Sequence, residues 1–221
     1  MQRGLRILST ALMTAGIVVL LDVGLTLIWK EPLSTVYGAI QQGEAEDELA
    51  ALEQRFPTAA DLRALEDLQL AKRLERLADR FEDEARRGEG IGRIKIPRID
   101  LDIVFVEGTD TASLQKGPGR YPSTAFPAQG RTVAIAGHRT TYLAPFGDID
   151  DIEDGDEITL EMPYGTFTYT VQKSEVVDPT DVWVINDRGY ERLVLSACHP
   201  KYSAAQRYII FAKLTDFADA D

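Results

Sequence analysis

From Arg93 onward the chain consists of short segments in which apolar and polar residues alternate, and this pattern restricts the fold more than any other feature. Turn residues such as Tyr164-Gly165 separate the segments. Alternation with a period of two is typical of β-strands. About seven or eight short strands with few helices favour a mainly β protein with a closed or nearly closed β-barrel. We expect strands at 93–108, 132–137, 157–162, 166–177, 181–185, 192–198 and 207–214.

An apolar run, residues 7–29, precedes this region. As a helix it would be about 35 Å long, which is enough to cross a bilayer core of about 30 Å. Arg3 and Arg6 come before the run, so we expect residues 1–30 to be a cytoplasmic N-terminus and transmembrane signal anchor. The catalytic part would then be extracellular, on a single-pass protein of the cell membrane. Asp22 is unfavourable at membrane depth.

Two alternatives compete with the anchor. A cleaved signal peptide is disfavoured because the apolar run is too long and no small-residue cleavage site follows it. A helix buried in a soluble core is the other alternative. We therefore expect residues 1–30 to remain as a membrane anchor.

Residues 31–89 are expected to form a helical stalk or appendage. Apolar residues recur at helical spacing within 44–87, and the other faces are rich in charge. Pro57 interrupts the pattern, and Thr58 with Asp61 resembles a capping box that begins a second helix. The segment is either solvated or packed on the domain, or it covers an active site or docks a partner.

Charge and cysteine content exclude several classes of protein. The net charge of −12 argues against nucleic acid as a partner, since binding to phosphates requires clustered Lys and Arg. One cysteine, Cys198, rules out an internal disulfide framework. Outside the cell a free thiol is prone to oxidation. Cys198 is therefore buried and inert, an intermolecular linker or a nucleophile.

Three residues at expected strand ends could carry chemistry together. Cys198 ends one strand, His138 ends another, and Arg207 begins the strand after Cys198. An imidazolium stabilises a thiolate and protonates a leaving amine, while a guanidinium binds an oxyanion. Such a set suits acyl transfer. His199 follows the cysteine directly and would point to the opposite face, so we expect a structural or rim role for it.

Three segments carry a likeness to a known family, namely "GPGRYPSTAFP" (117–127), "AGHRTTYLAPFGDID" (136–150) and "LSACHPKYSAAQR" (195–207). In this order and spacing they resemble the sortases, and they are most similar to class E sortases. The likeness runs from about Gly90 to Leu214. One departure is Ala197, because the family usually has Thr before the nucleophile.

The resemblance implies an eight-stranded sortase β-barrel, which we place at 90–216 with an acidic tail at 217–221. It also implies a cysteine transpeptidase without a cofactor. Cys198 matches the nucleophile, His138 the acid and base, and Arg207 the arginine that binds substrate and oxyanion. Such enzymes cleave a sorting signal, typically Leu-Ala-x-Thr-Gly in this class, between Thr and Gly. They transfer the protein to an amine of the cell wall precursor or of a pilin.

Other residues within the likeness are candidates for the substrate groove. These are Tyr121, Arg139, Tyr142 and Tyr202, and each tyrosine could equally pack on the barrel. The acidic segment 147–157 does not fit a calcium-binding EF-hand loop, because Ile152 falls at the third ligand position, so no metal is expected. A second hypothesis is a catalytically weak module that binds sorting-signal peptide or wall precursor. A third is a structural protein with Cys198 in an intermolecular disulfide.

Overall fold

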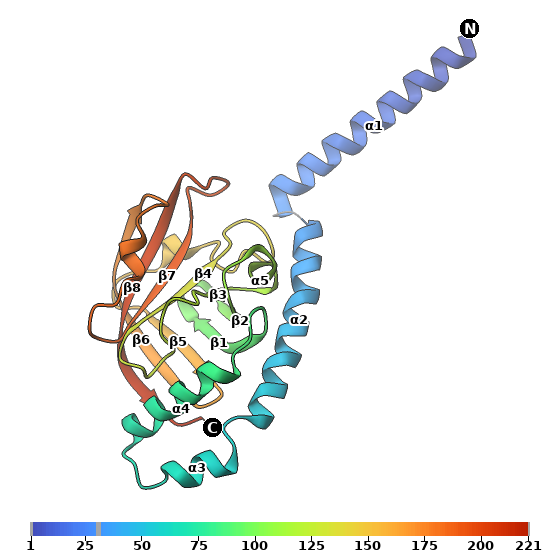
Figure 1. The fold of residues 1–221 in the computed structure, drawn as a ribbon. Helices are drawn as coiled ribbons and strands as arrows, with labels where there is room; N and C mark the ends of the chain where they lie inside the picture. Colours follow the sequence, from blue (N-terminus) through green and yellow to red (C-terminus); the bar gives the residue numbers. More distant parts are fainter. Residues whose placement is uncertain (1, 30–31, 221) are drawn as a thin grey trace.

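The structure, a computed structural model, describes residues 2–29 and 32–220, and a closed barrel of eight strands is its main body (Figure 1). Residues 1, 30, 31 and 221, at the ends of the expected anchor, appendage and tail, lie outside the described part. The strands are β1 (Gly90–Ile96), β2 (Leu101–Glu107), β3 (Gly119–Arg120), β4 (Thr132–Gly137), β5 (Glu157–Met162), β6 (Gly165–Val177), β7 (Arg192–His199) and β8 (Gln206–Ala218). The mainly β barrel expected from the sequence is confirmed.

Around the barrel the strands follow the order β1-β2-β3-β4-β7-β8-β6-β5, and the last strand pairs with the first. β2 with β3 and β4 with β7 are parallel pairs, and the remaining pairs are antiparallel. β8 continues to Ala218, beyond the expected boundary at residue 216. The parallel alignment of β4 with β7 places the C-terminal ends of both strands at the same rim.

The strand expected at 181–185 is wrong, because this segment contains the 3-10 helix η3 (Val182–Ile185). Its β-branched residues suggested a strand, but a closed barrel offers no free edge for another strand. The carbonyls of Val184 and Asn186 instead accept hydrogen bonds from the buried guanidinium of Arg192. The shorter 3-10 helices η1 (Pro97–Ile99) and η2 (Ile149–Asp151) also connect strands.

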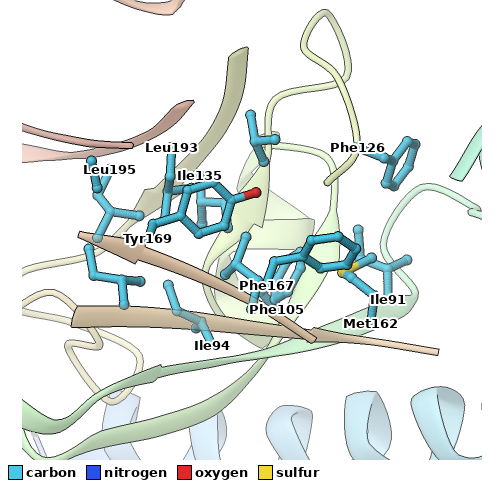
Figure 2. Close-up of a cluster of buried hydrophobic side chains, with 14 of the residues drawn as sticks. Ile91, Ile94, Phe105, Phe126, Ile135, Met162, Phe167, Tyr169, Leu193 and Leu195 are labelled. Carbon is cyan, nitrogen blue, oxygen red and sulfur yellow. The ribbon is translucent and has the colours of Figure 1, made fainter. Parts of the chain in front are cut away.

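The interior of the barrel is filled by one large hydrophobic cluster (Figure 2). Alternate residues of the strands point inward, for example Phe167 and Tyr169 of β6, both almost fully buried. The Tyr169 hydroxyl donates a 2.8 Å hydrogen bond to Glu191, so its polar atom has a partner within the apolar surroundings. Burial of apolar side chains is the main source of stability in a domain of this size.

Five helices are described outside the barrel: α1 (Gln2–Trp29), α2 (Pro32–Arg55), α3 (Ala59–Leu65), α4 (Leu70–Glu84) and α5 (Thr111–Lys116). The predicted break near Pro57 and the capping box are confirmed, since the Thr58 side chain accepts from the Asp61 amide and the Thr58 amide donates to Asp61. α4 packs its apolar face, including Phe81, against one end of the barrel. α1 projects away from the barrel (Figure 1).

No helix among the described residues combines the length and the apolar character needed to cross a bilayer. The transmembrane helix expected from the sequence is therefore not confirmed.

α2 lies along the barrel wall and is attached by polar contacts as well as apolar ones. The side-chain amide of Gln42 donates to the Val104 and Lys116 carbonyls and accepts from the Val104 amide. The Glu48 carboxylate accepts from Lys116 and from the Gly90 amide. Gln42 thus satisfies the backbone of β2 at a place where that strand is not paired with β3.

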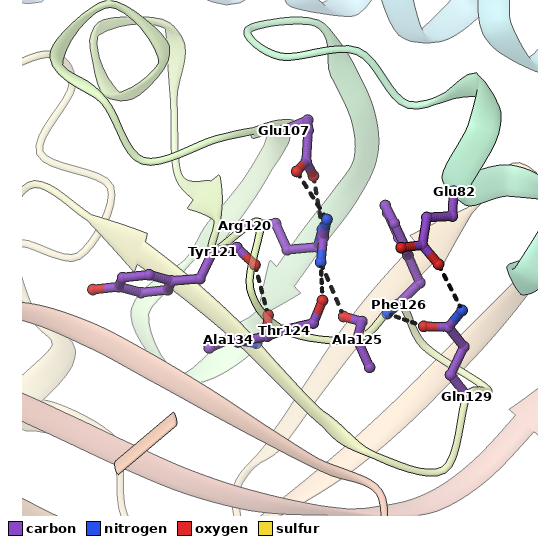
Figure 3. A network of polar contacts seen from close by, with 9 residues as sticks. All are labelled: Glu82, Glu107, Arg120, Tyr121, Thr124, Ala125, Phe126, Gln129 and Ala134. Carbon is purple, nitrogen blue, oxygen red and sulfur yellow. Dashed lines mark hydrogen bonds and ion pairs between the residues drawn. The ribbon is translucent and has the colours of Figure 1, made fainter. Parts of the chain in front are cut away.

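The connection between β3 and β4 is organised by the buried guanidinium of Arg120 (Figure 3). It forms a bidentate ion pair with Glu107, in which Nε and Nη2 lie 2.7 and 2.8 Å from the two carboxylate oxygens. It also stacks over the ring of Phe126. It also donates to the carbonyls of Thr124 and Ala125. These contacts hold the 121–131 loop against the barrel, and Tyr121 is the first residue of this loop.

Candidate active site

Cys198 lies near the end of β7, directly opposite Arg207 of β8 in the antiparallel ladder. Cys198 is a free thiol and is partly accessible. Arg207 is partly buried, and its Nη1 donates to the carbonyls of Ala204 and Gln206, at 3.0 and 2.9 Å. The thiol is therefore not fully buried, and a guanidinium is held on the neighbouring strand.

His138 follows β4 immediately. Gly137 of β4 is paired with Ala197 of β7 in the parallel ladder, and His138 and Cys198 are the residues that directly follow this pair. A Cβ at position 137 would lie 2.4 Å from the ring of Phe146, so only glycine fits before His138. Burial lowers the pKa of the His138 imidazole below its ordinary value, because the charged form is poorly solvated there.

Cys198, His138 and Arg207 all line one hollow of about 240 Å³. Its lining is Thr109, Leu114, Tyr121, Ala136, Gly137, His138, Ser196, Ala197, Cys198 and Arg207. A second hollow of about 320 Å³ meets the first at Cys198 and is lined by Arg139, Thr140, Tyr202, Ser203 and Ala204. Cys198 therefore lines both hollows.

A hollow of about 420 Å³, larger than these two, lies at the other end of the barrel beneath α4. Its lining includes Phe167, Leu214 and Glu191 but neither cysteine nor histidine. Burial raises the pKa of the Glu191 carboxyl, which accepts hydrogen bonds from the Ala128 and Gly130 amides. Because this hollow is lined by neither Cys198 nor His138, it is not the candidate active site.

Arg139, one of the candidate groove residues, has a buried side chain. It pairs with Asp150 and lies 3.2 Å from Nδ1 of His199. Its Nε has no hydrogen-bond partner within the described part of the chain. This residue connects the loop after β4 with η2 and the end of β7, and it also lines the second hollow, so its contact with substrate stays a prediction.

The three candidate tyrosines lie on different sides of Cys198. Tyr121 lines the first hollow, and Tyr202, which is largely exposed, lines the second. Tyr142 lines neither hollow as described but packs its ring on His138 at a centroid distance of 5.3 Å. The structure therefore brings Cys198, His138, Arg207 and Tyr121 to one hollow, while their chemical roles stay predictions.

The acidic segment 147–157 is occupied by ion pairs. Asp148 pairs with Lys201, and Arg98 pairs with Glu153 and Asp156. Within residues 2–29 and 32–220, no group of three or more His, Cys, Asp and Glu side chains is arranged to hold a metal ion.

A thiol, an imidazole and a guanidinium at one rim of a closed β-barrel can together carry out cysteine-dependent acyl transfer. Comparison with known proteins gives the family. The sortase domain family matches residues 94–215, more than half of the chain, and the chain therefore belongs to the sortase family.

Individual relatives agree with this assignment. Sortase D of Bacillus subtilis is 36% identical over 130 residues, which are 57% of this chain and 64% of that protein. Sortase SrtE1 of Streptomyces coelicolor is 29% identical over 145 residues, 58% of this chain and 41% of the relative. The chain thus matches less than two thirds of the length of these relatives.

Solved structures show the same barrel. Sortase E from Streptomyces avermitilis is 34% identical, with a TM-score of 0.55 over 61% of this chain and 93% of that one. A Clostridium perfringens sortase D5 transpeptidase is 25% identical, with a TM-score of 0.63 over 79% of this chain and 99% of that one.

Several residues at the site were not singled out from the sequence. Thr109, Leu114 and Ser196 line the first hollow, and Tyr37 of α2 contacts Tyr142. Only the barrel closure and the packing of α2 bring these residues to the rim. A glycine inside a helix often marks close packing, but α2 contains both Gly38, which lies against Tyr142, and Gly43, which has nothing within 4 Å, so this signal does not single out the contact.

Proposed function

We propose that this sortase is a cysteine transpeptidase that cleaves a C-terminal sorting signal of the Leu-Ala-x-Thr-Gly type between Thr and Gly. It transfers the threonyl end to an amine of the cell wall precursor or of a pilin. The observation that carries the proposal is the hollow shared by Cys198, His138 and Arg207. The surface proteins or pilins that bear the signal are its partners.

In the first step the Cys198 thiolate attacks the Thr carbonyl carbon, and Arg207 stabilises the oxyanion that develops on the carbonyl oxygen. The peptide bond breaks, a thioester forms, and the His138 imidazolium gives its proton to the leaving amine of Gly. In the second step an incoming amine attacks the thioester. Neutral His138 accepts the proton of that amine, and the thiolate leaves.

We further propose that the protein belongs to class E. The three motifs and the match to sortase E at 34% identity support this. Sortase D of Bacillus subtilis matches with similar identity, so a substrate comparison is needed to separate the classes. Reaction with a Leu-Ala-x-Thr-Gly peptide in preference to a Leu-Pro-x-Thr-Gly peptide would support class E, and the reverse preference would contradict it.

We also propose a single-pass membrane location, with the N-terminus in the cytoplasm and the barrel outside. The support comes from the sequence, since residues 7–29 are mostly apolar apart from Asp22 and follow Arg3 and Arg6, and from the exposure of α1 side chains such as Leu12 and Leu20. Protease added to intact cells should digest the barrel and spare the N-terminus, and full protection of the barrel would contradict this orientation.

The experiment that tests the activity is adduct formation by the full-length chain. The protein is incubated with a Leu-Ala-x-Thr-Gly peptide without an acceptor amine, and the mass of the acyl-enzyme is measured. An adduct on Cys198 that ends in Thr supports the reaction. Cys198→Ala is the control, and an adduct in that variant would contradict the assignment of the nucleophile.

A second candidate, a weak sortase-like binding module, is favoured by Ala197. This buried residue lines the hollow where the family usually has a threonine hydroxyl. Labelling with a thiol-directed sulfonate separates the two functions, because a poised thiolate reacts much faster than an ordinary thiol. Slow labelling, together with peptide binding but no adduct, would favour the binding module.

A further inference from the structure

The imidazole of His138 packs against the ring of Tyr142. The ring centroids are 5.3 Å apart and the planes are inclined by 44°. Tyr142 belongs to the loop that leaves β4 and returns through Phe146, whose amide donates to the His138 carbonyl at 2.9 Å. The backbone of His138 is thus held by the loop, and its ring has a flat neighbour that limits its rotation.

Tyr142 is itself held from two helices. Its hydroxyl accepts a 3.1 Å hydrogen bond from the side-chain amide of Gln115 in α5. The ring of Tyr37 in α2 meets the Tyr142 ring edge-on, with centroids 6.1 Å apart and planes at 66°. An edge-on arrangement at this distance is favourable for aromatic pairs.

The backbone of the loop is also shaped by α2. Tyr142, Leu143 and Ala144 all have positive φ, at 49°, 67° and 46°, a conformation that costs energy for residues other than glycine. A Cβ at Gly38 would lie 3.0 Å from the Cα of Tyr142. The absence of a side chain at Gly38 therefore allows the helix to approach this unusual loop closely.

α2 is firmly placed where it makes these contacts. Gln42 lies one helical turn beyond Gly38 and bonds to the backbone on either side of the α5 connection, at Val104 and Lys116. Because Gln42 is buried and its contacts are specific, sliding of the helix would leave buried polar groups without partners. The position of Tyr37 relative to the barrel is therefore well determined.

We propose that Tyr142 is a positioning residue that orients the ring of His138, and that Tyr37 and Gly38 of α2 complete this support. The helix before the barrel is then part of the catalytic apparatus. The proposal deepens the transpeptidase function proposed above and rests on it only for the kinetic readout.

The charged and titratable groups near His138 come from several elements around the hollow. Arg207 and Cys198 lie across the hollow on β8 and β7, and Tyr121 lies on the loop after β3. Tyr142 adds a neutral ring, and Arg139 is paired with Asp150. Loss of the Tyr142 ring exposes the imidazole to water, and this solvation favours its protonated form.

The first test uses Tyr142→Ala and Tyr142→Phe in the full-length chain, solubilised in a mild detergent. We expect Tyr142→Ala to lower kcat by about 10- to 100-fold, with KM changed by no more than about twofold. The pKa of His138, followed by NMR on histidine-labelled protein, should rise, because the more exposed imidazole is better solvated in its charged form. Tyr142→Phe retains the ring and should restore both values.

The second test isolates the helix. Gly38→Val pushes the helix away from Tyr142, whereas Gly43→Val makes the same change where nothing lies within 4 Å. We expect Gly38→Val to lower kcat and raise the His138 pKa, and Gly43→Val to change neither. Equal effects of the two variants would overturn the role of α2.

The NMR readout requires no substrate and separates two kinds of failure. If the wild-type protein cleaves no peptide but the His138 pKa shifts as expected, the proposed substrate is wrong and the positioning role stands. If Tyr142→Ala keeps the wild-type His138 pKa and the wild-type kcat, the positioning role is wrong. The His138 signal is assigned as the one that disappears in His138→Gln.

Discussion

Cys198 and Arg207 are paired residues in the ladder between β7 and β8. Directly opposed residues of an antiparallel pair point to the same face of the sheet, with Cβ atoms about 5 Å apart. The strand register therefore brings the thiol and the guanidinium together, although the 200–205 loop separates them in the chain. A shift of one residue would send one of the two side chains to the opposite face.

From this relationship we expect Arg207→Lys to lower kcat by about 100-fold or more, because an ammonium group lacks the planar fork that binds a developing oxyanion. The melting temperature should change little, since Arg207 bonds only to carbonyls of its own turn among the described contacts. Single-turnover cleavage of the sorting-signal peptide measures the effect. Arg131→Lys, an exposed change away from the hollow, is the control. Near-wild-type turnover in Arg207→Lys would contradict the role of this residue.

The lowered pKa of His138 predicts a dependence of stability on pH. The unfolded chain takes up a proton at an ordinary pKa of about 6.5, whereas the folded chain does so only at lower pH. The free energy of unfolding should therefore be highest above pH 6.5 and fall as the pH decreases through this value. The loss is complete once the pH lies below the folded pKa.

Urea unfolding of the wild type and of His138→Gln, from pH 5 to pH 7.5, measures this contribution. The difference between the two curves isolates His138 from Glu191, whose raised pKa acts in the opposite direction over the range above its ordinary value. Parallel curves for the two proteins would show that burial does not perturb His138.

Gln42 should stabilise the attachment of α2. Gln42→Leu leaves the amide and carbonyl of Val104 and the carbonyl of Lys116 without their partner, so we expect a loss of about 1–3 kcal/mol in the free energy of unfolding. Gln41→Leu, on the adjacent and less buried position, is the matched control. Equal urea midpoints for the two variants would show that the Gln42 contacts contribute nothing.

The buried pair of Arg120 and Glu107 predicts strong non-additivity. Arg120→Met leaves an unpaired buried carboxylate and should cost about 3–5 kcal/mol. The double variant Arg120→Met/Glu107→Leu should recover much of this loss, because it leaves no buried charge. Urea denaturation of the two single variants and the double variant measures the coupling. A double variant as unstable as the sum of the single ones would contradict the interpretation.

Much of the barrel was predictable because its strands alternate or are wholly apolar between clear turns. The expected segments 132–137 and 157–162 coincide with β4 and β5. The prediction of a strand at 181–185 was wrong because β-branched residues form a strand only where the edge of a sheet is free to pair with them. The two-residue strand β3 is too short to give any periodic pattern.

The candidate site was predictable in part. Cys198 as a lone thiol, and its likeness to the sortase nucleophile together with His138 and Arg207, follow from residue types and motifs. The residues that support His138 could not be predicted in this way. They come from three separate segments, namely Tyr37 with Gly38, Gln115 and Tyr142. Their spacing has no regular pattern in the chain.

The sequence by itself determined the local features of this protein, namely the strand periods, the Thr58 capping box, the lone cysteine and the motifs of its family. Those features depend on neighbours within a few residues. Only the tertiary structure decided that β4 and β7 run in parallel to one rim and that α2 reaches Tyr142. These arrangements depend on barrel closure and side-chain packing between distant segments, which local propensity does not encode.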